Sequence, residues 1–353
     1  MGMSTRSTIA AAAALVLLAA GCGGDGDEPP ASGPTESVSA EWQAVIEAAK
    51  AEGSVVWYSQ APPASREALK AAFEARYPEI TVEIRALNQA EIEAALQVEH
   101  DTGTPGADVV TTVNYGWVTE RLAQDDWFTA LTGPAVAADE WVDRGYVLDG
   151  KVVVAPLGVV SIGWNTQLFP EGLRSYEDLL DPRLGDGAIG IVGPEPALLA
   201  DFWTFIEEHH VPNFVERFAA QKPTFYRSAA LINEAVASGE VAVGAFTTAV
   251  DMVNLREQGA PVDFVVPDPA WTAQNLVYIV ESAGHPNAAQ LFVDFFASPE
   301  GQRAAAKYGA TPLSAVAPET LGGNSRIVLT NLDRILEPGW AEDFAARWRE
   351  IYE

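Results

Sequence analysis

The stretch EWQAVIEAAKAEGSVVWYS, residues 41–59, decides the fold. Its first part repeats apolar residues at helical spacing, at Trp42, Val45, Ile46 and Ala49. Gly53 then predicts the end of this helix, because glycine readily adopts the left-handed conformation in which helices stop. SVVWYS follows at once and predicts a short strand. A helix joined directly to a strand is typical of an α/β protein.

The same alternation continues along the chain. Helical patterns occupy residues 65–78 and 90–100, and strand patterns occupy residues 81–87 and 107–113. Strands separated by helices of this length predict a mostly parallel sheet with helices on its faces. The predicted fold class is therefore α/β.

A second set of helices and strands fills the middle of the chain. It includes strand patterns at residues 189–193 and 241–246 and a helical pattern at residues 230–239. We therefore expect two lobes joined by two hinge crossings. Lobe 1 is predicted to comprise residues 41–157 plus 271–353, and lobe 2 residues 158–270.

The N-terminal residues predict secretion. Arg6 precedes an apolar run over residues 9–20, and small residues lead to Cys22, the only cysteine of the chain. This arrangement resembles a lipoprotein signal, which implies a signal peptide at residues 1–21 and a lipidated Cys22. A plain signal peptide with an incidental cysteine is the alternative. Residues 22–40 are rich in Gly, Pro, Ser and acid and predict a disordered tether.

The net charge of −28 excludes one class of partner. A strongly acidic surface without a basic patch repels nucleic acid, so no nucleic-acid partner is expected. Two interpretations explain the acidity: attraction of a cationic ligand, or a protein surface that is acidic and solvated as a whole. We favour the second.

Motifs for catalysis are missing from the sequence. It contains no GxSxG, GxxxxGK[ST], GxGxxG or HExxH pattern. His209 and His210 are adjacent on a predicted helix and point in different directions, so they form a poor chelate. The sequence therefore predicts no catalytic residue, no metal site and no cofactor.

Polar and aromatic residues gather just past the predicted strands. Ligands of open parallel sheets bind beyond the carboxyl ends of the strands, so these residues predict a ligand site. Several of them have a simpler interpretation: Ser228 and Asn114 as helix caps, and the two threonines as a cap for the helix that follows. The candidates are Ser59, Gln60, Asn114, Tyr115, Trp117, Glu195, Tyr226, Arg227, Ser228, Thr247 and Thr248.

Five stretches carry a resemblance to a known family. They are TPGADVV (104–110), GVVSIGWNT (158–166), YEDLLDPRLGDGAIGI (176–191), ALINEAVASGEVAVGAF (230–246) and HPNAAQLFVDFFASPEGQ (285–302). The chain resembles the extracellular solute-binding proteins of ABC importers, in the cluster that handles ferric iron, thiamine, aminoethylphosphonate, sugar phosphates and polyamines. The resemblance implies a two-lobed type II binding fold that closes over one small solute. It also implies a monomer that delivers this solute to an ABC permease in the membrane.

The ligand is predicted from departures from the family pattern. Ferric-binding relatives place His or Tyr after the first strand, Tyr before the Asn-Thr of the crossover strand, and tandem tyrosines after a lobe 2 strand. Here Ser59-Gln60, Trp164 and Thr247-Thr248 occupy the matching positions. Ferric iron needs hard anionic ligands such as phenolates, so direct iron binding is disfavoured. Direct iron binding remains an alternative only if Tyr58, Tyr115 and Tyr226 form a different cluster of iron ligands.

The remaining hydroxyl, amide and indole groups predict a small organic solute. Arg227 is suited to hold a phosphonate or carboxylate in a bidentate fork. Glu195 suits an amine instead, and Trp117, Trp164 or Trp271 can stack on a cation. We therefore expect an organic anion or zwitterion. An extracytoplasmic enzyme and a ligand sensor remain the alternatives from other classes.

Overall fold

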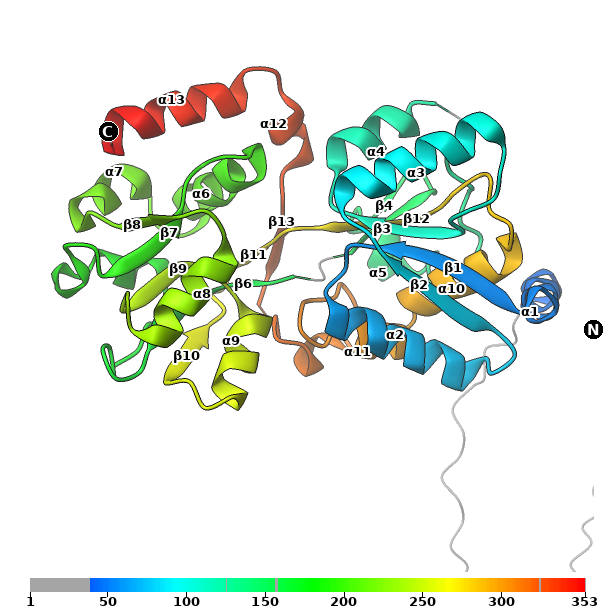
Figure 1. Ribbon diagram of the computed structural model, residues 1–353, viewed down its shortest axis with the longest axis horizontal. Helices are drawn as coiled ribbons and strands as arrows, with labels where there is room; N and C mark the ends of the chain where they lie inside the picture. Colours follow the sequence, from blue (N-terminus) through cyan, green and yellow to red (C-terminus); the bar gives the residue numbers. More distant parts are fainter. Residues whose placement is uncertain (1–38, 125, 156–157, 324, 353) are drawn as a thin grey trace, which may run out of the picture. The chain divides into compact units, whose positions relative to one another are not determined.

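A computed structural model describes residues 39–352 except 125, 156–157 and 324. The predicted signal peptide, Cys22 and all but the last two residues of the predicted tether lie outside the described residues. Figure 1 shows that the described part of the chain contains two larger sheets, each flanked by helices. Each sheet has its own hydrophobic core, and the α/β class is confirmed.

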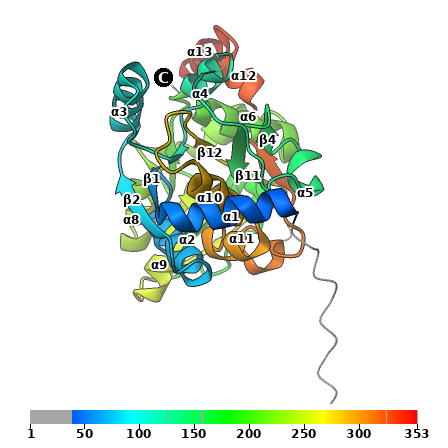
Figure 2. The same cartoon turned by 90° about the vertical axis from the view of Figure 1, so that its right-hand side faces the viewer.

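The six-stranded sheet carries the first core. Its strand order is β2 (Thr81–Ala86), β1 (Ser54–Ser59), β3 (Val109–Thr112), β12 (Asn275–Ile279), β5 (Val152–Ala155) and β4 (Val147–Leu148). Its helices are α1 (Ala40–Glu52), α2 (Pro63–Arg76), α3 (Gln89–Thr102), α4 (Tyr115–Leu122), α5 (Asp139–Val142), α10 (Pro286–Ala297) and α11 (Pro299–Ala305). Phe292 of α10 packs against Trp57 and Phe73, and α1 lies alongside α10 (Figure 2).

The five-stranded sheet carries the second core. Its order is β10 (Val262–Val265), β6 (Val160–Asn165), β9 (Val243–Thr248), β7 (Ile189–Val192) and β8 (Thr224–Tyr226). One core contains side chains of α6 (Ala197–His209), α7 (Phe214–Phe218) and α13 (Trp340–Tyr352). A smaller cluster contains side chains of α8 (Ala229–Ser238) and α9 (Ala249–Glu257). The remaining elements are β11 (Ala270–Thr272) paired with β13 (Ile327–Leu329), α12 (Leu332–Leu336), and short 3-10 turns at Tyr176–Leu180, Pro182–Leu184, Ala219–Gln221 and Ala317–Glu319.

Most strands of each sheet run in one direction, as predicted, but both sheets are mixed because single strands run against the others. β1 runs parallel to β2 and β3, whereas β12 runs antiparallel to β3 and β5. In the five-stranded sheet, β6 runs antiparallel to β9 and β10. β6 and β12 are the strands that the chain enters after passing from one sheet to the other. They therefore start at the edge where the parallel strands end, and run in the opposite direction.

The C-terminal helix corrects the predicted lobe boundary. The sequence predicts that residues 271–353 belong together with the first sheet, but α13 packs on the core of the second. Its Trp348 lies 5.1 Å from Trp203 of α6, measured between ring centroids, and both side chains are buried. The last stretch of the chain therefore passes from the first sheet to the second once more.

Ser298 separates two consecutive helices, since it ends α10 and accepts a hydrogen bond from the Gly301 N–H of α11 at 3.1 Å. One local prediction differs from the structure. The strand predicted to end at Phe246 continues as β9 through Thr248. By contrast, the stops at Gly53 and Gly239 are confirmed, with φ angles of 72° and 79°.

Asp294 of α10 makes the stability of the protein pH-dependent. Its Oδ1 accepts hydrogen bonds from the Ala135 and Val136 N–H groups, but burial raises the pKa of this carboxyl from 3.8 to about 6. The folded protein therefore holds the proton of this carboxyl more tightly than the unfolded chain does. The resulting stabilisation is fully present below the unfolded pKa of 3.8 and is lost as the pH rises through the folded pKa of about 6. The shift corresponds to about 3 kcal/mol.

We therefore expect Asp294→Asn to be more stable than the wild type at pH 8 and to lose most of this advantage at pH 4.5, close to the unfolded pKa. The amide carbonyl still accepts from Ala135 but never ionises, so the difference isolates this one carboxyl. Urea unfolding of both proteins at several pH values measures it. Equal stabilities at pH 8 and pH 4.5 would contradict the prediction.

Candidate functional site

Polar side chains gather at one edge of the six-stranded sheet. The carboxyl ends of β1, β3 and β5 lie there with the amino end of β12, since Ser59 pairs with Thr111 and Asn275 with Ala155. Ser59 is fully buried, and its Oγ accepts from the Ala61 N–H at 3.2 Å. Its hydroxyl therefore shapes the loop after β1.

Gln60 and Asn114 complete this edge. The Gln60 Oε1 accepts from the Thr112 Oγ1 at 2.8 Å and from the Val113 N–H at 3.2 Å. These bonds fix the amide, and its Nε2 has no partner among the described residues. The Asn114 Oδ1 caps α4 by accepting from the Trp117 N–H, and its Nδ2 donates to Glu93. The interpretation of Asn114 as a cap is thus confirmed, and Gln60 offers a free donor.

Tyr115 ties this edge to the segments that connect the two sheets. Its buried hydroxyl donates to the Gln274 carbonyl at 2.5 Å and accepts from the Gln274 N–H at 2.7 Å. Gln274 in turn donates through its Nε2 to the Thr330 carbonyl at 2.7 Å. Burial raises the pKa of Tyr115, so this phenol stays protonated.

Tyr115→Phe is expected to lower the free energy of unfolding by about 1–3 kcal/mol, because it leaves the buried Gln274 N–H without an acceptor. Tyr77→Phe is the matched control, since the Tyr77 hydroxyl makes no hydrogen bond to the described residues. Guanidinium unfolding followed by circular dichroism measures both. The same small change in both variants would show that the Tyr115 hydroxyl contributes nothing.

The corresponding edge of the five-stranded sheet holds the other predicted residues. The carboxyl ends of β7, β8 and β9 lie there with the amino end of β6, since Val192 pairs with Tyr226 and Val160 with Thr248. Thr247 is fully buried, and its Oγ1 donates to the Ser161 carbonyl at 2.8 Å. The Thr248 Oγ1 donates to the Asp251 Oδ2 at 2.5 Å. Both hydroxyl groups are therefore engaged within the fold, and Thr248 precedes α9.

Around β7 and β8, the predicted residues differ in orientation. The Tyr226 ring lies over Gly190, and its hydroxyl donates to the Glu240 Oε1 at 2.8 Å, away from the edge. Burial and Glu240 raise the pKa of Tyr226 to about 12. Arg227 is exposed with no partner among the described residues. Ser228 caps α8 by accepting from the Leu231 N–H at 3.4 Å, which confirms its simpler interpretation.

Glu195 also lies near this edge. It is exposed and precedes α6 through a cis bond to Pro196, and its nearest cation is Arg349, 3.9 Å away. Its carboxylate is therefore accessible to solvent.

Trp164 is not brought together with the others. It pairs with Val243, at the opposite end of β9 from Thr248, and its ring packs on Gly172 with 8% of the residue exposed. The fold places this indole in the second core, away from the predicted site. Trp117 stays on the first sheet, where its ring stacks with Arg121 at 4.0 Å.

A buried carboxylate joins three segments where the chain passes between the sheets. The Asp201 Oδ2 of α6 accepts from the Trp271 Nε1 at 3.0 Å, in β11, and from the Asn331 N–H at 3.3 Å. Its Oδ1 accepts from the Arg334 Nη1 at 3.1 Å, and Arg334 also holds Glu208 through Nη2 at 2.7 Å. Burial raises the pKa of Asp201, and the Trp271 and Arg334 bonds oppose that rise. The network fastens the connecting segments to α6.

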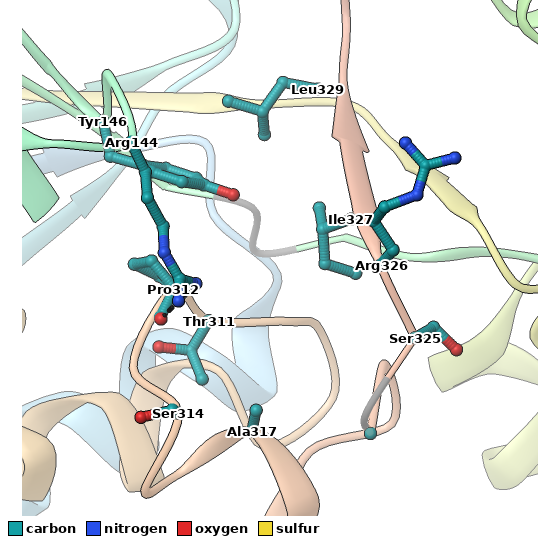
Figure 3. A pocket seen from close by; sticks show the side chains of 11 residues that line it. Arg144, Tyr146, Thr311, Pro312, Ser314, Ala317, Ser325, Arg326, Ile327 and Leu329 are labelled. Carbon is teal, nitrogen blue, oxygen red and sulfur yellow. Dashed lines mark hydrogen bonds between the residues drawn. The ribbon is translucent and has the colours of Figure 1, made fainter. Parts of the chain in front are cut away.

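A pocket of about 510 Å³ lies beside β13 and contains none of the predicted residues (Figure 3). Its polar groups include Arg144, which donates to the Pro312 carbonyl at 2.8 Å, and Tyr146, whose hydroxyl points toward β13. Ile327 and Leu329 supply an apolar wall, whereas the Arg326 guanidinium points away from Ile327. Tyr146, which lines this pocket, directly precedes β4, and β4 lies at the opposite end of the six-stranded sheet from β1 and β2. The pocket is therefore separate from the sheet edge that carries Gln60.

Ser54, His285 and Asp108 form an arrangement that the sequence did not predict. The Ser54 Oγ lies 3.0 Å from the His285 Nε2, and the His285 Nδ1 lies 2.8 Å from the Asp108 Oδ2. Asp108 also accepts from the Val56 N–H at 2.7 Å and the His285 N–H at 2.9 Å. The N–H groups at the start of α10 are taken by Glu52, so they are not available to an oxyanion. The arrangement fastens α10 to β1.

Residues 68–322 match the family of bacterial extracellular solute-binding proteins. The chain belongs to this family. A curated relative of this solute-binding protein is an uncharacterized protein of Haemophilus influenzae, 27% identical over 293 residues that cover 75% of this chain and 79% of the relative. Proteins of this kind are transport-associated binding proteins that act outside the cytoplasm. In the described part of the chain, no helix has the length and apolar character needed to cross a membrane.

Solved structures confirm the type II binding fold of this solute-binding protein. AfuA from Actinobacillus pleuropneumoniae, with exogenous fructose-6-phosphate bound, superposes with a TM-score of 0.59 at 21% identity and covers 85% of this chain and 98% of its own. Iron-bound HitA from Pseudomonas aeruginosa also gives 0.59, at 19% identity, with 84% and 99% covered. These neighbours bind different ligands, so their likeness extends to the fold alone.

The residues that join the connecting segments of this solute-binding protein were missed by the sequence reasoning. Asp201 lies inside a helix pattern and 133 residues from Arg334, and Gln274 lies in an irregular segment. The one available signal was Asp201 itself, because a carboxylate on the apolar face of an amphipathic helix needs a buried partner.

Proposed function

We propose that this protein is the solute-binding component of an ABC importer, and that it captures a small organic anion or zwitterion between two closing lobes. Phosphonates and sugar phosphates are the classes we favour. The observation that carries the proposal is a free polar group at each of the two sheet edges, the Gln60 amide nitrogen on one and the Arg227 guanidinium on the other. Both edges adjoin the segments that connect the sheets, where lobe closure brings ligand groups together.

Ferric iron is the alternative ligand within the family, and the tyrosines argue against it. The Tyr58 hydroxyl is bonded to Glu99 and Arg85, that of Tyr115 to Gln274, and that of Tyr226 to Glu240. These phenols belong to separate networks and do not form a cluster. Their raised pKa values also oppose the phenolate form that Fe(III) requires.

The proposal includes a lipid anchor through Cys22 and delivery to a permease. A short apolar run before Cys22 is too short for a comfortable membrane span, whereas lipidation would hold the protein at the outer face of the membrane. Solute binding would then bias an open–closed equilibrium, and the closed form would dock on the permease. A ligand sensor is the alternative that uses the same closure.

A thermal-shift screen tests the solute class. We expect phosphonates or sugar phosphates to raise the melting temperature, since a ligand at 100 times its Kd adds about 2.7 kcal/mol of stability. Ferric salts, thiamine and polyamines should have no effect. Stabilisation by ferric citrate with a visible phenolate absorption band would establish the iron alternative instead.

An extracytoplasmic enzyme is the candidate from another class, and Ser54–His285–Asp108 is the observation that favours it. Its spacing matches a nucleophile, base and orienting carboxylate. Two observations argue against catalysis. The Asp108 carboxylate accepts hydrogen bonds from two backbone N–H groups as well as contacting the His285 ring, and Glu52 already accepts from the nearest N–H groups that could stabilise an oxyanion. We therefore assign this triad a structural role.

A further inference from the structure

We infer that the pocket beside β13 is a second binding site, and that it takes a small carboxylic acid with an aliphatic body. The pocket measures about 510 Å³, which is within the usual range for small-molecule sites (Figure 3). It lies by β4, at the opposite end of the six-stranded sheet from the strand that leads to Gln60. The inference therefore concerns a separate ligand and does not depend on the proposed function.

Two buried residues present hydroxyl groups to this pocket. Tyr146 is 6% exposed, its ring is held by an edge contact with Trp141 at 6.1 Å between centroids, and its hydroxyl points toward β13 (Figure 3). This hydroxyl has no hydrogen-bond partner among the described residues. Burial raises the pKa of Tyr146, so the phenol stays protonated and is a donor. Thr311 is equally buried, and its Oγ1 accepts from the Leu313 N–H at 3.3 Å, which leaves its own hydrogen free.

Arg144 adds a positive charge to the same side of the pocket. Its Nη1 donates to the Pro312 carbonyl at 2.8 Å, which holds the guanidinium against the loop after α11. The acidic neighbour Glu140 accepts instead from the N–H and the hydroxyl of Ser314, at 2.8 and 2.7 Å. No carboxylate of the described residues lies within ion-pair distance of Arg144. The guanidinium therefore keeps donors for an anion.

The wall formed by β13 is aliphatic. Ile327 and Leu329 alternate with Val328 along the strand, so they share one face of it, while Val328 packs on the second core. Both line the pocket and are only half-buried. An apolar group placed against them would remove their surface from water, which favours binding. The Arg326 guanidinium points away from Ile327 and adds no charge to this wall (Figure 3).

The two sides of the pocket together select the ligand. A carboxylate accepts charge-assisted hydrogen bonds from the guanidinium and from both hydroxyl groups. A hydrocarbon chain on the same molecule would cover Ile327 and Leu329, which acetate or inorganic phosphate would leave exposed. An amine with the same chain would face the positive charge of Arg144. A small aliphatic carboxylate is therefore the class that uses both sides.

Calorimetric titration with hexanoate at neutral pH tests the inference, with acetate and hexylamine as matched probes. We expect hexanoate to bind, acetate to bind at least tenfold more weakly, and hexylamine not to bind. Arg144→Gln and Tyr146→Phe should each weaken hexanoate binding at least tenfold. Arg326→Gln is the matched control and should leave the affinity unchanged within about twofold, because its guanidinium points away from the pocket. Unchanged affinity in both Arg144→Gln and Tyr146→Phe overturns the inference.

The melting temperature of Tyr146→Phe separates a ligand contact from a structural role. The hydroxyl has no partner in the described part of the chain, so we expect the free variant to melt like the wild type and to gain less from hexanoate. A lower melting temperature with unchanged affinity counts against the inference. Hexanoate binding that is lost in Arg227→Gln but kept in Arg144→Gln would place the acid at the edge of the five-stranded sheet. That result overturns the inference and leaves the proposed function standing.

Discussion

Asp108→Ala is expected to lower the free energy of unfolding by about 3–5 kcal/mol. The carboxylate is 1% exposed and accepts from the Val56 N–H, the His285 N–H and the His285 ring. Alanine leaves the two backbone donors without an acceptor inside the fold and detaches the start of α10 from β1. Urea unfolding of the purified protein, followed by tryptophan fluorescence, measures the loss.

Ser54→Ala is the matched control for Asp108→Ala. It removes only the hydroxyl that contacts the His285 Nε2 at 3.0 Å, at a partly exposed position, so we expect a loss below about 1 kcal/mol. Neither the wild type nor the variants should hydrolyse p-nitrophenyl esters above the background rate. Hydrolysis that disappears in Ser54→Ala would show that the triad is catalytic and that our structural assignment is wrong.

Gly301→Ala is expected to cost about 3 kcal/mol or more, because no side chain can move to make room. A Cβ atom on Gly301 would overlap the Phe295 carbonyl oxygen and lie 2.7 Å from its carbonyl carbon and 2.9 Å from the Phe296 Cα. These are backbone atoms at the end of α10. The glycine of the Ser-Pro-Glu-Gly-Gln sequence is thus required where α11 turns against α10.

Gly116→Ala is the control for the glycine prediction. Gly116 also lies in a helix and is exposed, and a Cβ atom added to it would have no neighbouring atom closer than 3.8 Å. We expect the stability of this variant to be unchanged or to rise by up to about 1 kcal/mol, since alanine favours helices. Thermal unfolding of both variants measures the contrast. Equal effects at the two positions would show that backbone packing at Gly301 is not the cause.

The order of helices and strands could be predicted from the sequence, but the direction of two strands could not. Periodicity places α1, β1, α2, β2, α3 and β3 because each element is decided by its own residues. The antiparallel direction of β6 and β12 depends on where the chain re-enters a sheet, and no local pattern records that. The same reason explains the misplaced α13, because its amphipathic pattern does not record which core the helix covers.

The candidate site was predictable only in outline. The rule that ligands bind past strand ends selected residues that do lie at the two sheet edges, and it could not tell a free side chain from an engaged one. Thr247 is the clearest case, because its partner Ser161 lies 86 residues away. Trp164 was selected through the family pattern, and its place at the opposite end of the sheet depends on the antiparallel course of β6.

The return of the C-terminus to the second sheet provides a way to observe solute capture. α1 begins on the first core and α13 ends on the second, so dyes attached near the two ends of the folded part would report the motion between the cores. Cys22 is the only natural cysteine, so cysteines introduced at exposed positions of α1 and α13 could be labelled selectively once Cys22 is replaced. Energy transfer between the dyes would then follow the proposed closure in real time without a label near the solute.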